Sequence, residues 1–181
     1  MKSAFRMAVG SLLLMGALVF VGAGDVSAQV ATAGPPIVVS GWRYEKGRSD
    51  LHLFHCEQAK CGTNSKVSYK ILAPGNAMTL EQYRDSQQQV AKALEQRTPG
   101  LKVTILGIDG DKSSGLPRLY KARRQMTAPN GQTEYVVSGL MFGSRASASL
   151  ISSSQDEKAS NDNHAQFVLA MMMFVQTPAK R

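Results

Sequence analysis

Apolar and polar residues alternate along two neighbouring stretches of the chain, which is the pattern of strands with one buried face. In residues 66–72, Val67, Tyr69 and Ile71 would share one face, and the polar residues between them would share the other. Residues 51–56 show the same period and are separated from 66–72 by a polar turn. The two stretches therefore predict a hairpin, and the β-branched and aromatic run 37–44 predicts an earlier strand.

Residues 79–97 carry the pattern of an amphipathic helix, with apolar side chains recurring at three- and four-residue spacing. Thr79 and Gln82 have the spacing of a capping box, and Met78 and Tyr83 have the spacing of a hydrophobic staple. Thr98-Pro99-Gly100 ends the pattern. One apolar face predicts that this helix covers one side of a sheet.

The second half of the chain predicts four strands and a last helix. The strands are expected at residues 101–108, 116–127, 133–142 and 145–153, and Asn130-Gly131 is a typical hairpin turn between two of them. Residues 154–163 are polar, and residues 164–176 predict a helix capped by Asn161 or Asp162. This helix is apolar nearly all round, which predicts burial on more than one side. Strands in runs with helices set apart predict the α+β class, an antiparallel sheet flanked by helices.

The N-terminus has the three parts of an export signal. Lys2 and Arg6 precede an apolar run from Met7 to Gly24, and Val26-Ser27-Ala28 then resembles a cleavage site. We expect residues 1–28 to be a signal peptide, 29–36 a linker, 37–176 a single domain and 177–181 a basic tail. The alternative is an uncleaved membrane anchor. Cleavage predicts a periplasmic or secreted protein with no integral membrane span.

The composition supports a folded, basic domain. Hydrophobic residues make up 43% of the 181 residues and charged residues 19%, which is enough apolar material for a core. The net charge is +8, and it stays clearly positive after removal of Lys2, Arg6 and Asp25. A basic exported domain favours anionic surfaces such as lipid headgroups or acidic glycans, and export argues against nucleic acid. A positive charge without any anionic ligand is the alternative.

The two cysteines, Cys56 and Cys61, flank the turn of the predicted hairpin. In an oxidising compartment this spacing favours a disulfide over a redox pair, which has two residues between its cysteines. Together with His52 and His55 they could instead form a metal site, but strand alternation places His55 on the opposite face from His52. His164 is expected at a helix start, hydrogen-bonded to solvent. We therefore predict a structural disulfide and no metal or other cofactor.

Other motifs do not form a catalytic or ligand site. Met171, Met172 and Met173 point in three directions on a helix, which favours core filling over a copper site. The run from Asp109 lacks the later ligands of a calcium loop. No serine lies in a nucleophile elbow, and carboxylates are scattered. The sequence indicates no enzyme, although catalytic groups that meet only in space leave an enzyme as an alternative.

The segment around residues 112–124 is basic and contains no acidic residue. One interpretation is an edge strand whose cations prevent pairing with another chain. The other is an anion-binding rim. The residues of that rim would be Arg118, Lys121, Arg123 and Arg124.

The order of elements resembles the PsbP-like superfamily, which includes the photosystem II extrinsic subunit, Ran-binding Mog proteins and small bacterial exported proteins. The resemblance lies in residues 135–139, 151–154 and 167–169, within a pattern that covers residues 37–176. It implies an α/β/α sandwich around an antiparallel sheet and a non-catalytic accessory or binding role. We therefore expect an exported binding protein of the bacterial cell envelope whose partner is another envelope protein or an anionic surface. A binder of anions, lipid headgroups or acidic glycans through the basic segment, a metal-binding protein and a periplasmic enzyme are the alternatives.

Overall fold

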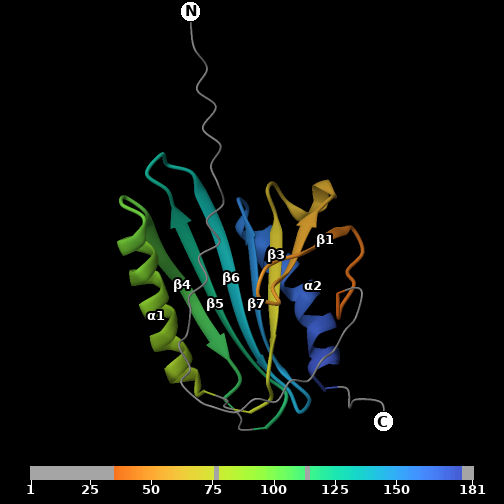
Figure 1. Ribbon diagram of the computed structural model, residues 1–181. Coiled ribbons are helices and arrows are strands. Elements are labelled where there is room, and N and C mark those ends of the chain that lie inside the picture. The colour runs from red at the N-terminus through yellow and green to blue at the C-terminus, as the bar shows by residue number, and fades with distance from the viewer. Residues whose placement is uncertain (1–34, 76–77, 113–114, 177–181) are drawn as a thin grey trace, which may run out of the picture.

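The computed structural model describes residues 35–75, 78–112 and 115–176, and within these ranges seven strands form one antiparallel sheet (Figure 1). Every neighbouring pair of strands is antiparallel. Across the sheet the strands are β1 (Trp42–Lys46), β2 (His52–Cys56), β3 (Lys66–Leu72), β7 (Ser147–Ser154), β6 (Thr133–Phe142), β5 (Arg118–Thr127) and β4 (Lys102–Gly110).

The first helix, α1 (Leu80–Arg97), begins as predicted with a capping box. The Thr79 hydroxyl accepts a hydrogen bond from the Gln82 amide at 3.1 Å, and the Gln82 side chain accepts one from the Thr79 amide at 2.8 Å. Tyr83, Gln87 and Ala91 form the buried stripe of the helix. This stripe packs against β4 and β5.

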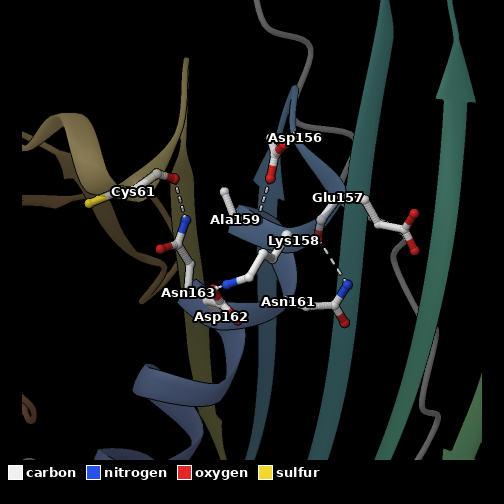
Figure 2. Close-up of polar contacts among 8 residues, drawn as sticks. All are labelled: Cys61, Asp156, Glu157, Lys158, Ala159, Asn161, Asp162 and Asn163. Carbon is white, nitrogen blue, oxygen red and sulfur yellow. Dashed lines mark hydrogen bonds and ion pairs between the residues drawn. The ribbon is translucent and has the colours of Figure 1, made fainter.

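The second helix, α2 (Glu157–Gln176), begins earlier than the predicted start at residue 164, and that prediction was wrong (Figure 2). The Asp156 carboxylate accepts a hydrogen bond from the Ala159 amide at 2.6 Å and so caps the helix. The predicted caps, Asn161 and Asp162, lie inside the first turns instead. Asp162 pairs with Lys158 at 2.5 Å, and this pairing lets a polar stretch continue as helix.

Only one side of α2 is buried, so the prediction of burial on more than one side was also wrong. Its inward residues recur at helical spacing and include Phe167, Met171 and Val175. The side chains of Leu169 and Met173 are 72% and 73% exposed. Of the three consecutive methionines, therefore, Met171 alone fills the core completely.

The chain enters the sheet later than expected. The first strand was predicted from residue 37, but β1 begins at Trp42. Ile37 and Val39 are buried against the core without joining the sheet. Gly41 then turns the chain with a φ of 82°, a conformation that favours glycine.

The two helices lie on opposite faces of the sheet and cover different halves of it. On β5, Tyr120 and Ala122 face α1, whereas Leu119 and Lys121 point to the other side. The helix α1 packs on β4 and β5, and α2 packs on β6 and β7. The predicted α+β class, a single-domain antiparallel sheet with a helix on each face, is confirmed.

The expected signal peptide, most of the expected linker and the basic tail lie outside the described residues. Within the described ranges, neither α1 nor the 20-residue α2 is long and apolar enough to cross a membrane.

Candidate functional site

On the face of the sheet that carries α1, this helix packs on β4 and β5, and its Tyr83 reaches β6. The register places Leu53 opposite Ser68, Ser68 opposite Ile151, and Ile151 opposite Ser138, which makes one row across β2, β3, β7 and β6. We call the part of this face on β2, β3 and β7 the open half-face. Its residues are Leu53, His55, Lys66, Ser68, Lys70, Ser149, Ile151 and Ser153.

Ile151 is the main apolar feature of the open half-face. Its side chain is 39% exposed although β7 is the central strand of the sheet. Serines surround it, with Ser68 and Ser138 beside it in the row and Ser149 and Ser153 along its own strand. Serine side chains are short, so Ile151 stands above its neighbours. An aliphatic side chain that stands above its neighbours on an open sheet face is accessible to a partner, and burying it would be favourable.

Positive charge accompanies this isoleucine. Lys66 and Lys70 lie on the same side of β3, separated by Ser68, and the defined residues of the open half-face include no acidic side chain. At the β1 edge, Glu45 pairs with Arg43 at 4.0 Å and with His55 at 3.3 Å. Glu45 thus contacts both basic side chains at the edge, and the middle of the open half-face carries the two lysines of β3.

Arg124 adds a buried cation at the border between α1 and the open half-face. Its side chain is only 5% exposed, and its guanidinium donates to Gln87 Oε1 at 3.1 Å and to Ser138 Oγ at 2.8 Å. No carboxylate within the described residues forms an ion pair with it. Burial lowers the pKa of Arg124. A buried cation with only neutral partners is costly, so this border favours a nearby negative charge.

The four cations of the predicted rim do not lie on one surface. Arg118 lies over the Phe142 ring, 5.5 Å from its centre, on the same face as the buried Arg124. Lys121 and Arg123 lie on the opposite face, where Arg123 pairs with Asp109 at 3.9 Å and with Glu157 at 4.0 Å. The edge-strand interpretation is wrong, because β5 lies between β4 and β6.

Cys56 and Cys61 close the connection between β2 and β3, with their sulfur atoms at disulfide distance, 1.92 Å. Cys61 ends the short helix η1 (Ala59–Cys61), and its carbonyl accepts hydrogen bonds from the Ser65 hydroxyl and, at 2.9 Å, from the Asn163 side chain (Figure 2). This contact attaches the disulfide loop to α2. The role of Asn163 could not be predicted from local patterns, because the two contacting residues are 102 positions apart in the chain.

The two histidines of β2, His52 and His55, each contact other side chains and do not converge on one metal position. His52 Nδ1 lies 3.1 Å from the Tyr44 hydroxyl, and its ring stacks on Tyr69 with 4.6 Å between ring centres. Burial is the main cause that lowers the pKa of His52. His55 lies on the open half-face beside Glu45. In the part of the chain that the structure describes, no three His, Cys, Asp or Glu residues are placed to share a metal ion.

His164 corrects another expectation, since it is buried in α2 rather than exposed at a helix start. Its Nε2 atom lies against Gly139, where an added Cβ would come within 2.6 Å of it. This close approach explains a glycine in the middle of β6. Burial, with a smaller effect from Lys121, lowers the pKa of His164 to about 4, so the ring is neutral at neutral pH.

Comparison with known proteins identifies the fold. No family model and no curated protein sequence matches this chain. The solution structure of cyanobacterial PsbP (CyanoP) from Synechocystis sp. PCC 6803 is similar over 74% of this chain and 81% of its own, with a TM-score of 0.53 and 9% identity. The Saccharomyces cerevisiae Ran-binding protein Mog1p matches 77% of this chain and 84% of its own, with a TM-score of 0.44 and 13% identity. The predicted resemblance is therefore confirmed at the level of structure, and this chain has the PsbP-like fold.

Proposed function

We propose that this protein is an exported, non-catalytic binding protein of the cell envelope that holds an acidic segment of another envelope protein on its open half-face. The observation that carries the proposal is Ile151, exposed at the centre of the sheet among serines, with Lys66 and Lys70 on the neighbouring strand. Protein contact surfaces commonly combine such an apolar centre with charged residues around it.

The charges specify the chemistry of the partner. The two lysines of β3 and the buried Arg124 lie on one face, and Ser138 contacts Arg124 while lying opposite Ile151 in the register. A partner that places an aliphatic side chain on Ile151 would bring its own acidic groups close to these cations. Complementary charge of this kind selects the partner and speeds association.

Export is supported by two features of the chain. The N-terminal residues have the basic, apolar and small-residue parts of a signal peptide. Cys56 and Cys61 lie at disulfide distance, and disulfides persist in oxidising compartments. The mass of the protein isolated from its own cells should correspond to an N-terminus at or near Gln29. Intact Met1 in the membrane fraction would contradict cleavage and favour an anchor.

The binding surface can be tested by photocrosslinking in living cells. A photoreactive amino acid at position 151 should form one dominant covalent adduct with an envelope protein, which mass spectrometry identifies. Leu106 provides a matched control, because it is 36% exposed against 39% for Ile151 and lies on the edge strand β4. Lys70→Glu should reduce the adduct at 151. Equal adducts at both positions, or none at 151, would contradict the proposal.

A further inference from the structure

The C-terminal half of α2 leaves a second surface exposed, on the opposite side of the molecule from α1. Val38, Leu169 and Met173 are 82%, 72% and 73% exposed, and they are joined by the partly buried Phe174. We call these four residues the apolar patch. A shallow open hollow within it is lined by Pro36, Ile37, Val38, Arg145, Ala170, Met173 and Phe174.

The outward side of α2 changes character along the helix. Its beginning carries three exposed acidic side chains, Asp156, Glu157 and Asp162, which are labelled in Figure 2. Leu169 and Met173, which are four residues apart and therefore on one stripe, carry the apolar end. The helix thus has a mainly acidic start, where Lys158 pairs with Asp162, and an apolar end.

The apolar end also carries a cation, Arg145. The Arg145 guanidinium lies 4.5 Å from the centre of the Phe174 ring, and the Arg145 amide donates to the Val175 carbonyl at 2.9 Å. After Gln176 the sequence continues with Lys180 and Arg181 and contains no acidic residue. The described chain also starts here, since Pro36 and Val38 line the hollow. Apolar side chains, the Arg145 cation and the start and end of the described chain therefore meet at one place.

We propose that the apolar patch is a membrane-docking surface for an anionic lipid bilayer. Leu169, Met173 and Val38 would enter the boundary between headgroups and acyl chains, and Arg145 would lie at the phosphate level. The acidic start of α2 would then point away from the lipid. Peripheral proteins bind membranes through this combination of apolar and basic residues. A two-fold contact between copies of this chain through the patch is less favourable, because it would bring the two Arg145 side chains together.

The test is co-sedimentation of the complete protein, as its host processes it, with vesicles of phosphatidylglycerol and phosphatidylcholine at low salt. Leu169→Gln with Met173→Gln changes no charge and should weaken binding about tenfold or more, because the apolar contribution is lost. Leu106→Gln with Leu116→Gln is the matched control, since these exposed leucines lie elsewhere, and its binding should stay within about twofold of the parent. Arg145→Gln should bind more weakly, and pure phosphatidylcholine should bind the parent poorly.

Three results would overturn the proposal. The first is that the Leu169→Gln/Met173→Gln variant binds the anionic vesicles as strongly as the parent does. Another is no parent binding to anionic vesicles. The third is a dimer of the parent in solution that the same change converts to a monomer, which would make the patch a contact between copies. None of these results bears on the open half-face, which is on the other side of the sheet, so this proposal and the proposed function can fail separately.

Discussion

The buried side chains beneath the two helices differ in number and in polarity. Under α2 the sheet contributes Trp42, Phe54, Val67, Tyr69 and Leu150 to a large apolar cluster that Phe167, Met171 and Val175 complete. Under α1 the buried cluster is small and consists of Tyr83, Tyr120, Ala122 and Phe142. It is bordered by the buried polar side chains of Gln87, Arg124 and Ser138.

The α1 side relies on hydrogen bonds where the α2 side relies on packing. The Tyr83 hydroxyl donates to the Ser138 carbonyl at 3.0 Å, and the Tyr120 hydroxyl donates to the Met78 carbonyl at 3.0 Å. Burial raises the pKa of Tyr83, which keeps its hydroxyl protonated as a donor. The packing beneath α2 therefore contributes most of the stability of the fold, while the α1 side places polar groups next to the open half-face. Mutations can test this division.

The largest effect is expected for Phe167→Ala. The Phe167 ring is fully buried and lies edge-on to Trp42 and Phe54, with 5.1 Å and 5.0 Å between ring centres. Its loss should lower the free energy of unfolding by about 3–5 kcal/mol in urea denaturation. Phe174→Ala, on the half-buried side of the same helix, should cost only about 1 kcal/mol. Equal losses would contradict a helix with one buried side.

The next effect is a pH dependence carried by His164. Its pKa is about 4 in the folded protein and about 6.5 in an unfolded chain, so the unfolded state takes up the proton first as the pH falls. The stabilisation is therefore complete above pH 6.5 and lost as the pH falls towards 4. Between pH 7 and 4 the parent should lose roughly 3 kcal/mol more stability than His164→Gln. Parallel pH curves for the two proteins would contradict a neutral, buried histidine.

A smaller effect should follow from replacing both cysteines with serine. The disulfide closes a short loop that Asn163 attaches to α2, and its loss should cost about 2 kcal/mol by the entropy of the unfolded chain. Alkylation of the native protein without reductant should label neither cysteine. Two reactive thiols, or a stoichiometric metal that copurifies, would overturn the disulfide.

The smallest effect is expected on the α1 side. Arg124→Met alone leaves Gln87 and Ser138 without their partner and should cost about 1 kcal/mol. Arg124→Met combined with Gln87→Met should recover part of this loss, because an apolar pair replaces a buried polar one. Chemical denaturation measures both. A loss as large as that of Phe167→Ala would show that the polar border also holds the fold.

Local signals in the sequence predicted most of the elements. The capping box of α1, the Asn130-Gly131 turn and the alternation in β3 all depend on neighbouring residues. The start of α2 was misplaced because residues 157–163 are polar even where they are buried, as Ser160 and Asn163 are, and a search for apolar periodicity misses them. The capping aspartate, Asp156, is the local signal that could have found it.

The candidate site was harder to predict, because it depends on which half of the sheet each helix covers. The alternation of β3 was predicted, but nothing local shows that α1 stops short of β7 and leaves Ile151 exposed. From the sequence, Arg124 is expected to be an exposed cation in a basic segment. Its burial depends on the packing of α1 over β5, where Gln87 accepts its hydrogen bond. Leu169 and Met173 were expected in the core because they are apolar. Their exposure depends on what packs against α2, which the sequence does not show.

The central claim, that the open half-face binds an acidic partner, is tested most directly by measuring affinity for the protein captured at position 151. Ile151→Asp and Leu106→Asp introduce the same charge at side chains of nearly equal exposure, 39% and 36%. Isothermal titration should show at least about a tenfold loss of affinity for Ile151→Asp, with an unchanged melting temperature and no loss for Leu106→Asp. Parent-like affinity for Ile151→Asp would contradict the assignment of the open half-face as the binding surface.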